Sequence, residues 1–110
     1  MAASLRMLYS THPTREQAQQ TAQALIQARL AACCTLLPGA ESHYIWQGVL
    51  TAAEEVILLS KTTASAAPHA MAEIARLHPY ECPAVLSMDV TDATPAFAAW
   101  VGDHISHENS

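Results

Sequence analysis

The segment His78-Pro79-Tyr80-Glu81-Cys82-Pro83 places four side chains that can do chemistry around two prolines. Imidazole, carboxylate and thiol groups all serve as metal ligands, and a site that combines nitrogen with sulfur suits zinc or copper. The prolines stiffen the segment and reduce the entropy lost in presenting these groups. The segment therefore predicts a metal site. The competing interpretation is a helix-to-strand connection in which His78 and Tyr80 only form hydrogen bonds.

The other two cysteines, Cys33 and Cys34, are adjacent. Neighbouring side chains on a strand point to opposite faces, so this pair does not easily bind one metal ion. An odd cysteine count is not the disulfide framework of a small secreted domain. We therefore expect a reducing compartment and a cytoplasmic location, and we expect at least one of the pair to pack as a small hydrophobic residue.

Two further histidines, His104 and His107, are three residues apart near the C-terminus, at a spacing that can chelate a metal on a helix. The polar end of the chain makes us interpret this pair as incidental. The sequence contains no glycine-rich phosphate loop, no His-Glu-x-x-His and no nucleophile elbow. We therefore expect a protein without enzymatic activity.

The length of 110 residues predicts a single domain over residues 1–110, with its core at about residues 5–105. The net charge is -5, and the five basic residues are scattered rather than clustered. Nucleic acids and anionic membranes require a basic footprint, so we expect neither as a partner. No run approaches 18 consecutive apolar residues, and the N-terminus does not resemble a secretion leader.

The first half of the chain predicts a strand, a helix and a strand that position these groups. Residues 5–10 alternate well enough for a short strand. Thr14 and Gln17 have the spacing of a capping box, which opens a helix with an apolar stripe as far as Leu30. Residues 33–37 predict a second strand, ended by the turn pair Pro38-Gly39.

The second half predicts two strands, a helix, a strand and a last helix. Residues 42–50 and 55–63 form the strands, with a loop at 51–54; alternatively, the first of them continues the strand at 33–37. Ser65 is positioned to cap a helix that His78-Pro79 ends. A strand follows at 84–90, and Thr94-Pro95 opens a helix that extends to Ile105. The order is that of an α+β, ferredoxin-like β-α-β-β-α-β sandwich with an extra C-terminal helix.

The run from Val56 to Leu59 is apolar at every position, so both faces of this strand require burial. Two helices can cover only one face of the sheet. Charged residues make up only 14% of the chain, against about 25% in an ordinary soluble domain. We therefore expect a second copy of the chain to cover the open face. The alternative is that the last helix folds across it.

Several short runs together resemble the CutA divalent-cation-tolerance family over nearly the whole chain, from about Leu8 to about Trp100. They are Leu30-Ala31-Ala32-Cys33, Leu37-Pro38-Gly39-Ala40, Ser42-x-Tyr44-x-Trp46-x-Gly48, Glu55-Val56 with Lys61-Thr62, and His78-Pro79-Tyr80-Glu81-x-Pro83. The resemblance implies a ferredoxin-like homotrimer, similar in build to the PII signalling proteins. It also implies a link to copper and divalent-cation tolerance, without an established catalytic activity.

The resemblance implies a copper site that this chain matches only in part. A family cysteine corresponds to Ser10 here, and a family His-His pair corresponds to Leu77-His78, so His78 alone is kept. Cys33 matches a cysteine of many members, and His12, beside Ser10, could substitute for the missing ligand. The metal ligands expected are therefore His78 with sulfur from Cys33 or Cys82, for copper or another divalent metal.

The same pattern implies a cleft between subunits, lined by Trp46, Lys61, Tyr80 and Glu81, that suits a small polar ligand. Alternatively, Lys61 and Glu81 form an ion pair between subunits and Trp46 anchors the interface. Two functions remain open. The first is a homotrimeric protein that binds or responds to metals. The second is a PII-like signalling or scaffold module that binds a small molecule or a partner segment.

Overall fold

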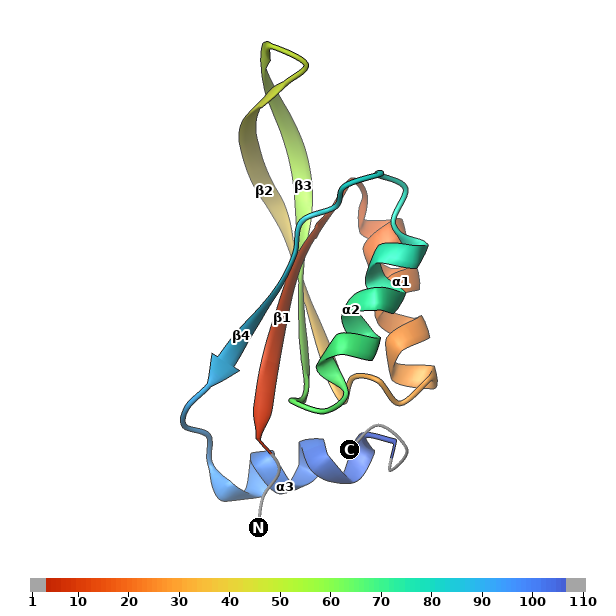
Figure 1. Cartoon of the computed structure of the whole chain (residues 1–110), viewed down its shortest axis with the longest axis vertical. Helices are drawn as coiled ribbons and strands as arrows, with labels where there is room; N and C mark the ends of the chain where they lie inside the picture. Colours follow the sequence, from red (N-terminus) through yellow and green to blue (C-terminus); the bar gives the residue numbers. More distant parts are fainter. Residues whose placement is uncertain (1–3, 107–110) are drawn as a thin grey trace.

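The computed structural model describes residues 4–106, which form four strands and three helices (Figure 1). In chain order these are β1 (Leu5–His12), α1 (Arg15–Gln27), β2 (Cys33–Trp46), β3 (Val49–Thr63), α2 (Ala67–Leu77), β4 (Val85–Val90) and α3 (Pro95–His104). The predicted order of elements is confirmed. None of the helices in the described part is long and apolar enough to cross a membrane.

The four strands form one sheet in the order β2-β3-β1-β4, and every neighbouring pair is antiparallel. Helix α1 connects β1 to β2, and α2 connects β3 to β4, so each helix joins two strands that are not neighbours. This is the split βαβ arrangement predicted for the chain. The chain is therefore an α+β protein with a four-stranded antiparallel sheet.

Helices α1 and α2 lie side by side on one face of the sheet and form the main core (Figure 1). The buried core residues are Leu8, Leu25, Leu30, Ala31, Ala67, Ala70 and Ile74, and Cys34, Met71 and Val85 pack against them. Burying a leucine or isoleucine side chain stabilises a fold by about 1.5–3 kcal/mol. The small alanines let the helices approach closely, and the leucines fill the space between helices and sheet.

The helix starts differ in part from the predicted caps. Thr14 caps α1 as expected, since its hydroxyl accepts the Gln17 N–H at 3.1 Å. The Gln17 side chain does not complete the capping box, because it binds His12 instead. The predicted Ser65 cap of α2 is wrong. The Thr63 hydroxyl accepts the Ala66 N–H at 3.3 Å, while no side chain caps the helix from the residue just before it.

Strands β2 and β3 form one hairpin that is longer than predicted and extends well beyond the rest of the sheet (Figure 1). Gln47 and Gly48 form its turn, with φ of 49° and 80° as a two-residue type I′ hairpin requires. The loop predicted at residues 51–54 is therefore wrong, because these residues pair with β2. Pro38-Gly39 does not end β2 either; it forms an irregularity within a continuous strand, as the alternative interpretation had it.

The second face of the sheet is only partly covered. Val56 and Leu58 point toward the helices and are buried, whereas Ile57 and Leu59 on the other face are half-buried. Helix α3 crosses the end of the sheet away from the hairpin, where it packs around Leu5 and Val90 (Figure 1). The middle of this face remains open, with Leu37, Leu86 and Met88 exposed by 47%, 56% and 39%.

Candidate functional site

His78 follows the last residue of α2, and its ring is held from both sides. Its Nε2 lies 2.7 Å from the carbonyl oxygen of Thr11. A carbonyl only accepts hydrogen bonds, so Nε2 carries the proton. The backbone N–H of Tyr80 donates to Nδ1 at 3.2 Å. Both ring nitrogens of the central predicted metal ligand are therefore engaged within the chain, as the hydrogen-bonding interpretation of this segment expects.

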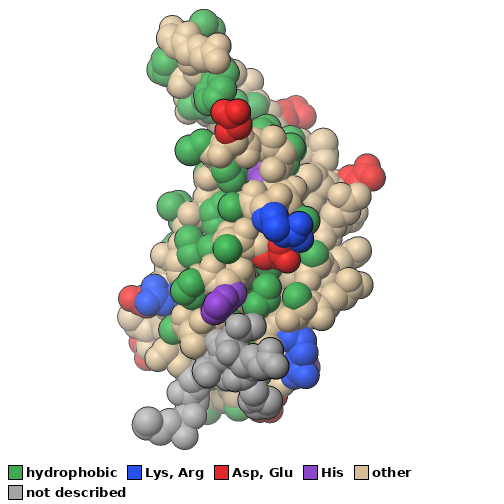
Figure 2. All heavy atoms as spheres, turned by 45° about the vertical axis from the view of Figure 1, so that its right-hand side comes forward, with side chains coloured by type: hydrophobic (Ala, Val, Ile, Leu, Met, Phe, Trp, Pro, Cys, Tyr) green, Lys and Arg blue, Asp and Glu red, His purple; other side chains and the backbone are tan. Residues whose placement is uncertain are grey.

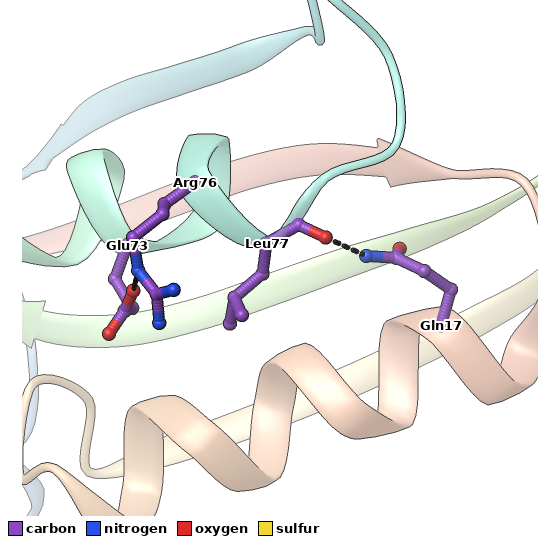
Figure 3. Close-up of polar contacts among 4 residues, drawn as sticks. All are labelled: Gln17, Glu73, Arg76 and Leu77. Atoms are coloured by element: carbon purple, nitrogen blue, oxygen red, sulfur yellow. Dashed lines mark hydrogen bonds and ion pairs between the residues drawn. The ribbon is translucent and has the colours of Figure 1, made fainter.

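A second buried histidine, His12, lies beside His78 with the ring centroids 4.9 Å apart. Its Nε2 is 2.7 Å from the hydroxyl of Ser10, and its Nδ1 binds the side-chain oxygen of Gln17. The Gln17 amide also donates to the carbonyl oxygen of Leu77 at 3.2 Å, which joins α1 to the end of α2 (Figure 3). Sequence reasoning named His12 only as a substitute ligand and missed this network.

The Leu77 carbonyl determines the proton positions in this network. Because that carbonyl only accepts, the Gln17 nitrogen must face it, and the Gln17 oxygen must face His12. His12 then carries its proton on Nδ1 and accepts the Ser10 hydroxyl at Nε2. Burial lowers the pKa of His12 below its ordinary value of 6.5; the Gln17 hydrogen bond opposes this shift, and electrostatic repulsion from the His78 ring in its protonated form adds to it. His12 is therefore a neutral, buried imidazole.

The three cysteines lie in different surroundings. Cys33 pairs with Lys61 of β3, and its sulfur is 3.9 Å from the Lys61 Nζ. Cys34 points to the opposite face and packs against the main core, where burial raises the pKa of its thiol. This confirms that the adjacent cysteines face opposite ways. Cys82 is exposed in the segment between α2 and β4.

One chain does not bring His78 and Cys33 together. Cys33 is level with Lys61 and Met7, whereas His78 binds the backbone of Thr11, four residues further along β1. Four residues of a strand span about 13 Å. Across residues 4–106, no group of three or more His, Cys, Asp or Glu side chains could hold a metal ion. His107 lies outside the described residues, so the interpretation of His104 and His107 as an incidental pair stays a prediction.

The residues expected to line the cleft also lie far apart within one chain. Trp46 is opposite Val49 at the tip of the hairpin, while Lys61 is twelve residues further along β3. Twelve strand residues span about 40 Å. The Lys61 Nζ binds the hydroxyl of Thr35 at 2.6 Å. A single cleft that contains both Trp46 and Lys61 therefore requires more than one copy of the chain.

Tyr80 and Glu81 lie between α2 and β4, where Glu81 is exposed and Tyr80 is 43% exposed. The Tyr80 ring packs against the His78 ring, with the centroids 4.8 Å apart and the ring planes tilted by 55°. Burial, then the negative charge of Glu55, then Tyr44 raise the pKa of the Tyr80 phenol. Sequence reasoning did not assign Glu55 and Tyr44 to the site. Both lie on the same face of the hairpin, since Tyr44 pairs with Thr51 and residues 51 and 55 of β3 have the same parity.

Comparison with known proteins gives one consistent result. The model of the family described as CutA1 divalent ion tolerance protein matches residues 6–104. The divalent-cation tolerance protein CutA of Thermus thermophilus is 35% identical over 94 residues, which are 86% of this chain and 91% of that protein. The CutA homolog of Xenopus laevis is 34% identical over 103 residues, 94% of this chain and 68% of that protein.

Solved structures agree with the sequence relatives. The crystal structure of CutA from Xylella fastidiosa superposes with a TM-score of 0.91 at 36% identity, covering 93% of this chain and 98% of that chain. CutA1 from Oryza sativa gives a TM-score of 0.93 at 25% identity, covering 96% and 97% of the two chains. The matched residues include nearly every described helix and strand. The chain therefore belongs to the CutA1 divalent ion tolerance protein family.

Proposed function

We propose that the protein is a cytoplasmic, non-enzymatic homotrimer of the divalent-cation-tolerance type, which binds or responds to copper and other divalent metals. The main observation in favour of this assembly is that the middle of the sheet face opposite α1 and α2 is not covered. Leu37, Leu86 and Met88 are exposed there, beside the half-buried Ile57 and Leu59. An apolar face of this kind on a small chain is typical of an interface, and a second copy is the simplest partner.

The projecting hairpin supports the same assembly. Ile45, Trp46, Val49 and Leu50 surround its turn and are exposed by 58% to 74%. Figure 2 shows hydrophobic side chains on this projection, with the nearest acidic groups below the tip. The hairpin lies too far from its own helices to be covered by them (Figure 1). Contact with neighbouring copies would bury both the tip and the open face.

The metal proposal must fit the contacts of His78. Soft thiolate ligands favour Cu(I), and imidazole suits copper. For His78 to bind a metal through Nδ1, the Tyr80 N–H must leave that nitrogen. Sulfur would come from Cys82, four residues further along the same segment, or from Cys33 of another copy. We propose His78 and one of these cysteines as the ligands, with the second copy completing the site.

Titration with Cu(I) tests this proposal. We expect His78→Ala to weaken Cu(I) binding by at least about tenfold, since it removes the only nitrogen ligand proposed. His69→Ala, which changes an exposed histidine on α2, is the matched control and should bind as the wild type does. Cys33→Ser and Cys82→Ser then identify the sulfur ligand. Equal affinity in the wild type and His78→Ala would contradict the metal proposal.

The second candidate is a PII-like module that binds a small molecule or a partner segment at the boundary between copies. The separation of Trp46 from Lys61 in one chain favours a cleft built from two copies. Tyr80 would contribute its partly exposed ring to that cleft. Unchanged Cu(I) binding by His78→Ala would leave this candidate as the better interpretation.

A further inference from the structure

The sheet face opposite α1 and α2, called the open face below, carries one acidic and one basic residue on its described strands. These are Glu55 and Lys61 of β3, which have the same parity along the strand as Ile57 and Leu59. Every residue that β1, β2 and β4 place on this face is uncharged. The open face is therefore apolar or neutral except for one charge of each sign.

The two charges cannot meet within one chain. Glu55 lies just past the last pair of β1 and β3, where the hairpin begins to project (Figure 1). Lys61 lies six residues further along the same strand, and six strand residues span about 20 Å. Neither residue takes part in an ion pair within residues 4–106. Opposite charges therefore stand at separate places on one face.

Both charged groups lack a partner of opposite sign. Glu55 is only 7% exposed, and its Oε2 has no hydrogen-bond partner among the described residues. The Lys61 Nζ has only uncharged neighbours, the Thr35 hydroxyl at 2.6 Å and the Cys33 sulfur at 3.9 Å. A buried carboxylate without a donor is unfavourable, and covering the open face would also remove water from Lys61.

The other four basic residues are placed away from the open face. Arg6 pairs with Asp89 and Arg76 with Glu73, Arg29 binds the carbonyl oxygens of Asp103 and His104, and Arg15 begins α1 with an exposed side chain. A second copy that covers the open face with its own open face would therefore bring one basic side chain to the contact, which is Lys61.

We propose that the ammonium group of Lys61 in one copy binds the carboxylate of Glu55 in a neighbouring copy. The contact rests on the proposed assembly and specifies which parts of the open face meet. In a ring of three copies, each copy presents two different surfaces to its two neighbours, so Glu55 of one surface can meet Lys61 of the other. Contact between two Glu55 positions would instead place like charges together. The four-carbon stem of lysine can reach a recessed carboxylate.

The structure favours Glu55 over Glu81, which the sequence offered as the partner of Lys61. Glu81 is exposed between α2 and β4, where water can solvate its carboxylate. Glu55 is buried and lies on the same face as Lys61. Breaking a buried ion pair by removing one partner is costly, whereas replacing both partners by neutral groups costs little. This difference gives the contact a measurable signature.

The experiment compares the wild type with Glu55→Gln, Lys61→Met and the double variant. Light scattering over a dilution series measures the concentration at which half of the assembly dissociates, and circular dichroism verifies that each chain is folded. We expect each single variant to raise this concentration by at least about tenfold, because it leaves one buried charge unpaired. The double variant should dissociate no more readily than either single variant, since neither charge remains.

Glu81→Gln is the matched control, because it removes the same charge from an exposed position. It should assemble as the wild type does, and its effect should simply add to that of Lys61→Met. Additive effects of Glu55→Gln and Lys61→Met would overturn the contact. Non-additive effects of Glu81→Gln and Lys61→Met would assign Lys61 to Glu81 instead.

A charge reversal tests the contact without any change at Glu55. Lys61→Glu places two carboxylates together and should leave most of the protein as single, folded chains. Assembly of Lys61→Glu at wild-type concentrations would overturn the contact, even where Glu55→Gln fails to fold. A wild type that is monomeric at every concentration contradicts the proposed assembly itself, whereas an intact wild-type assembly that tolerates Lys61→Glu contradicts only the contact between Glu55 and Lys61.

Discussion

At the scale of single residues, the Gln17 side chain decides the chemistry around the two buried histidines. Its amide nitrogen serves Leu77 and Thr21, which leaves its oxygen for His12. His12 must then be neutral to accept the Ser10 hydroxyl. This arrangement has the form of a nucleophile, a base and an orienting group, but Ser10 and His12 are fully buried. The network therefore fixes the ends of β1 and α2.

The buried state of His12 predicts that acid destabilises the protein. Its pKa in the folded protein lies below the ordinary value of 6.5, so the unfolded chain binds the proton more readily. The stability contributed by neutral His12 is present above pH 6.5 and is lost as the pH falls through the lowered pKa. Urea denaturation between about pH 8 and about pH 5 should show this loss.

His12→Asn is the variant for this prediction, because it keeps a polar side chain without a titrating group. It should flatten the acid dependence of the free energy of unfolding relative to the wild type. His69→Asn, at an exposed position of α2, should retain the dependence. An equal dependence in the wild type and His12→Asn would show that other groups cause the acid effect.

Predictions about single residues were correct where the local backbone geometry alone determines the direction of a side chain. The opposite orientation of Cys33 and Cys34 follows from the alternation of a strand, and the structure has it. The partner of Gln17 could not be predicted in the same way, because Leu77 is 60 residues away in the chain. The capping-box pattern correctly predicted the Thr14 hydrogen bond but assigned the Gln17 side chain to the wrong partner.

At the scale of elements, the hairpin of β2 and β3 shows why boundaries were harder to predict than order. Pro38-Gly39 is a strong turn signal, yet the strand continues through it because the flanking residues keep their partners on β3. Gln47-Gly48 is a weaker signal than Asn-Gly, and it forms the actual turn. The pairing of two long strands outweighs the local preference of the dipeptide.

The turn geometry predicts opposite effects for its two residues. Both have positive φ, 49° at Gln47 and 80° at Gly48, and a side chain in this region costs roughly 1–2 kcal/mol. Gly48→Ala should therefore destabilise the hairpin by about 1 kcal/mol, although no atom lies within 4 Å of the added Cβ. Gln47→Gly should relieve the strain already present. Thermal denaturation of both variants measures the two changes in the midpoint temperature of unfolding.

The prediction is specific because the midpoint temperature should fall in Gly48→Ala and rise in Gln47→Gly. A midpoint that falls in both variants would indicate that the Gln47 side chain contributes contacts that offset its strained backbone. A midpoint unchanged in Gly48→Ala would show that the tip unfolds separately from the sheet. In that case hydrogen exchange at residues 45–50 would report opening at low free energy.

At the scale of the whole molecule, the sequence predicts the order of the elements and also indicates where one chain leaves apolar surface uncovered. The consecutive apolar residues Val56 to Leu59 predicted that both sheet faces require burial. The structure covers one face with α1 and α2, and α3 reaches only the end of the other. The cleft expected at Trp46 and Lys61 is not formed within one chain, because twelve residues of β3 separate Lys61 from Val49, the partner of Trp46.

The open face therefore predicts which substitution would dissociate the proposed assembly without unfolding the chain. Leu86 lies in a row with Tyr9 and Leu59 across the sheet and is 56% exposed, so a lysine there is tolerated by the single chain. In the assembly each leucine would contribute about 1.5–3 kcal/mol, and a buried ammonium would add a desolvation cost. Light scattering of Leu86→Lys should give a lower mass than the wild type, with an unchanged circular dichroism spectrum.

Ile26→Lys, at a 40% exposed position on the helical side, should assemble normally. A wild type that is monomeric at every concentration would contradict the assembly, and an equal loss in Ile26→Lys would place the interface on the helices.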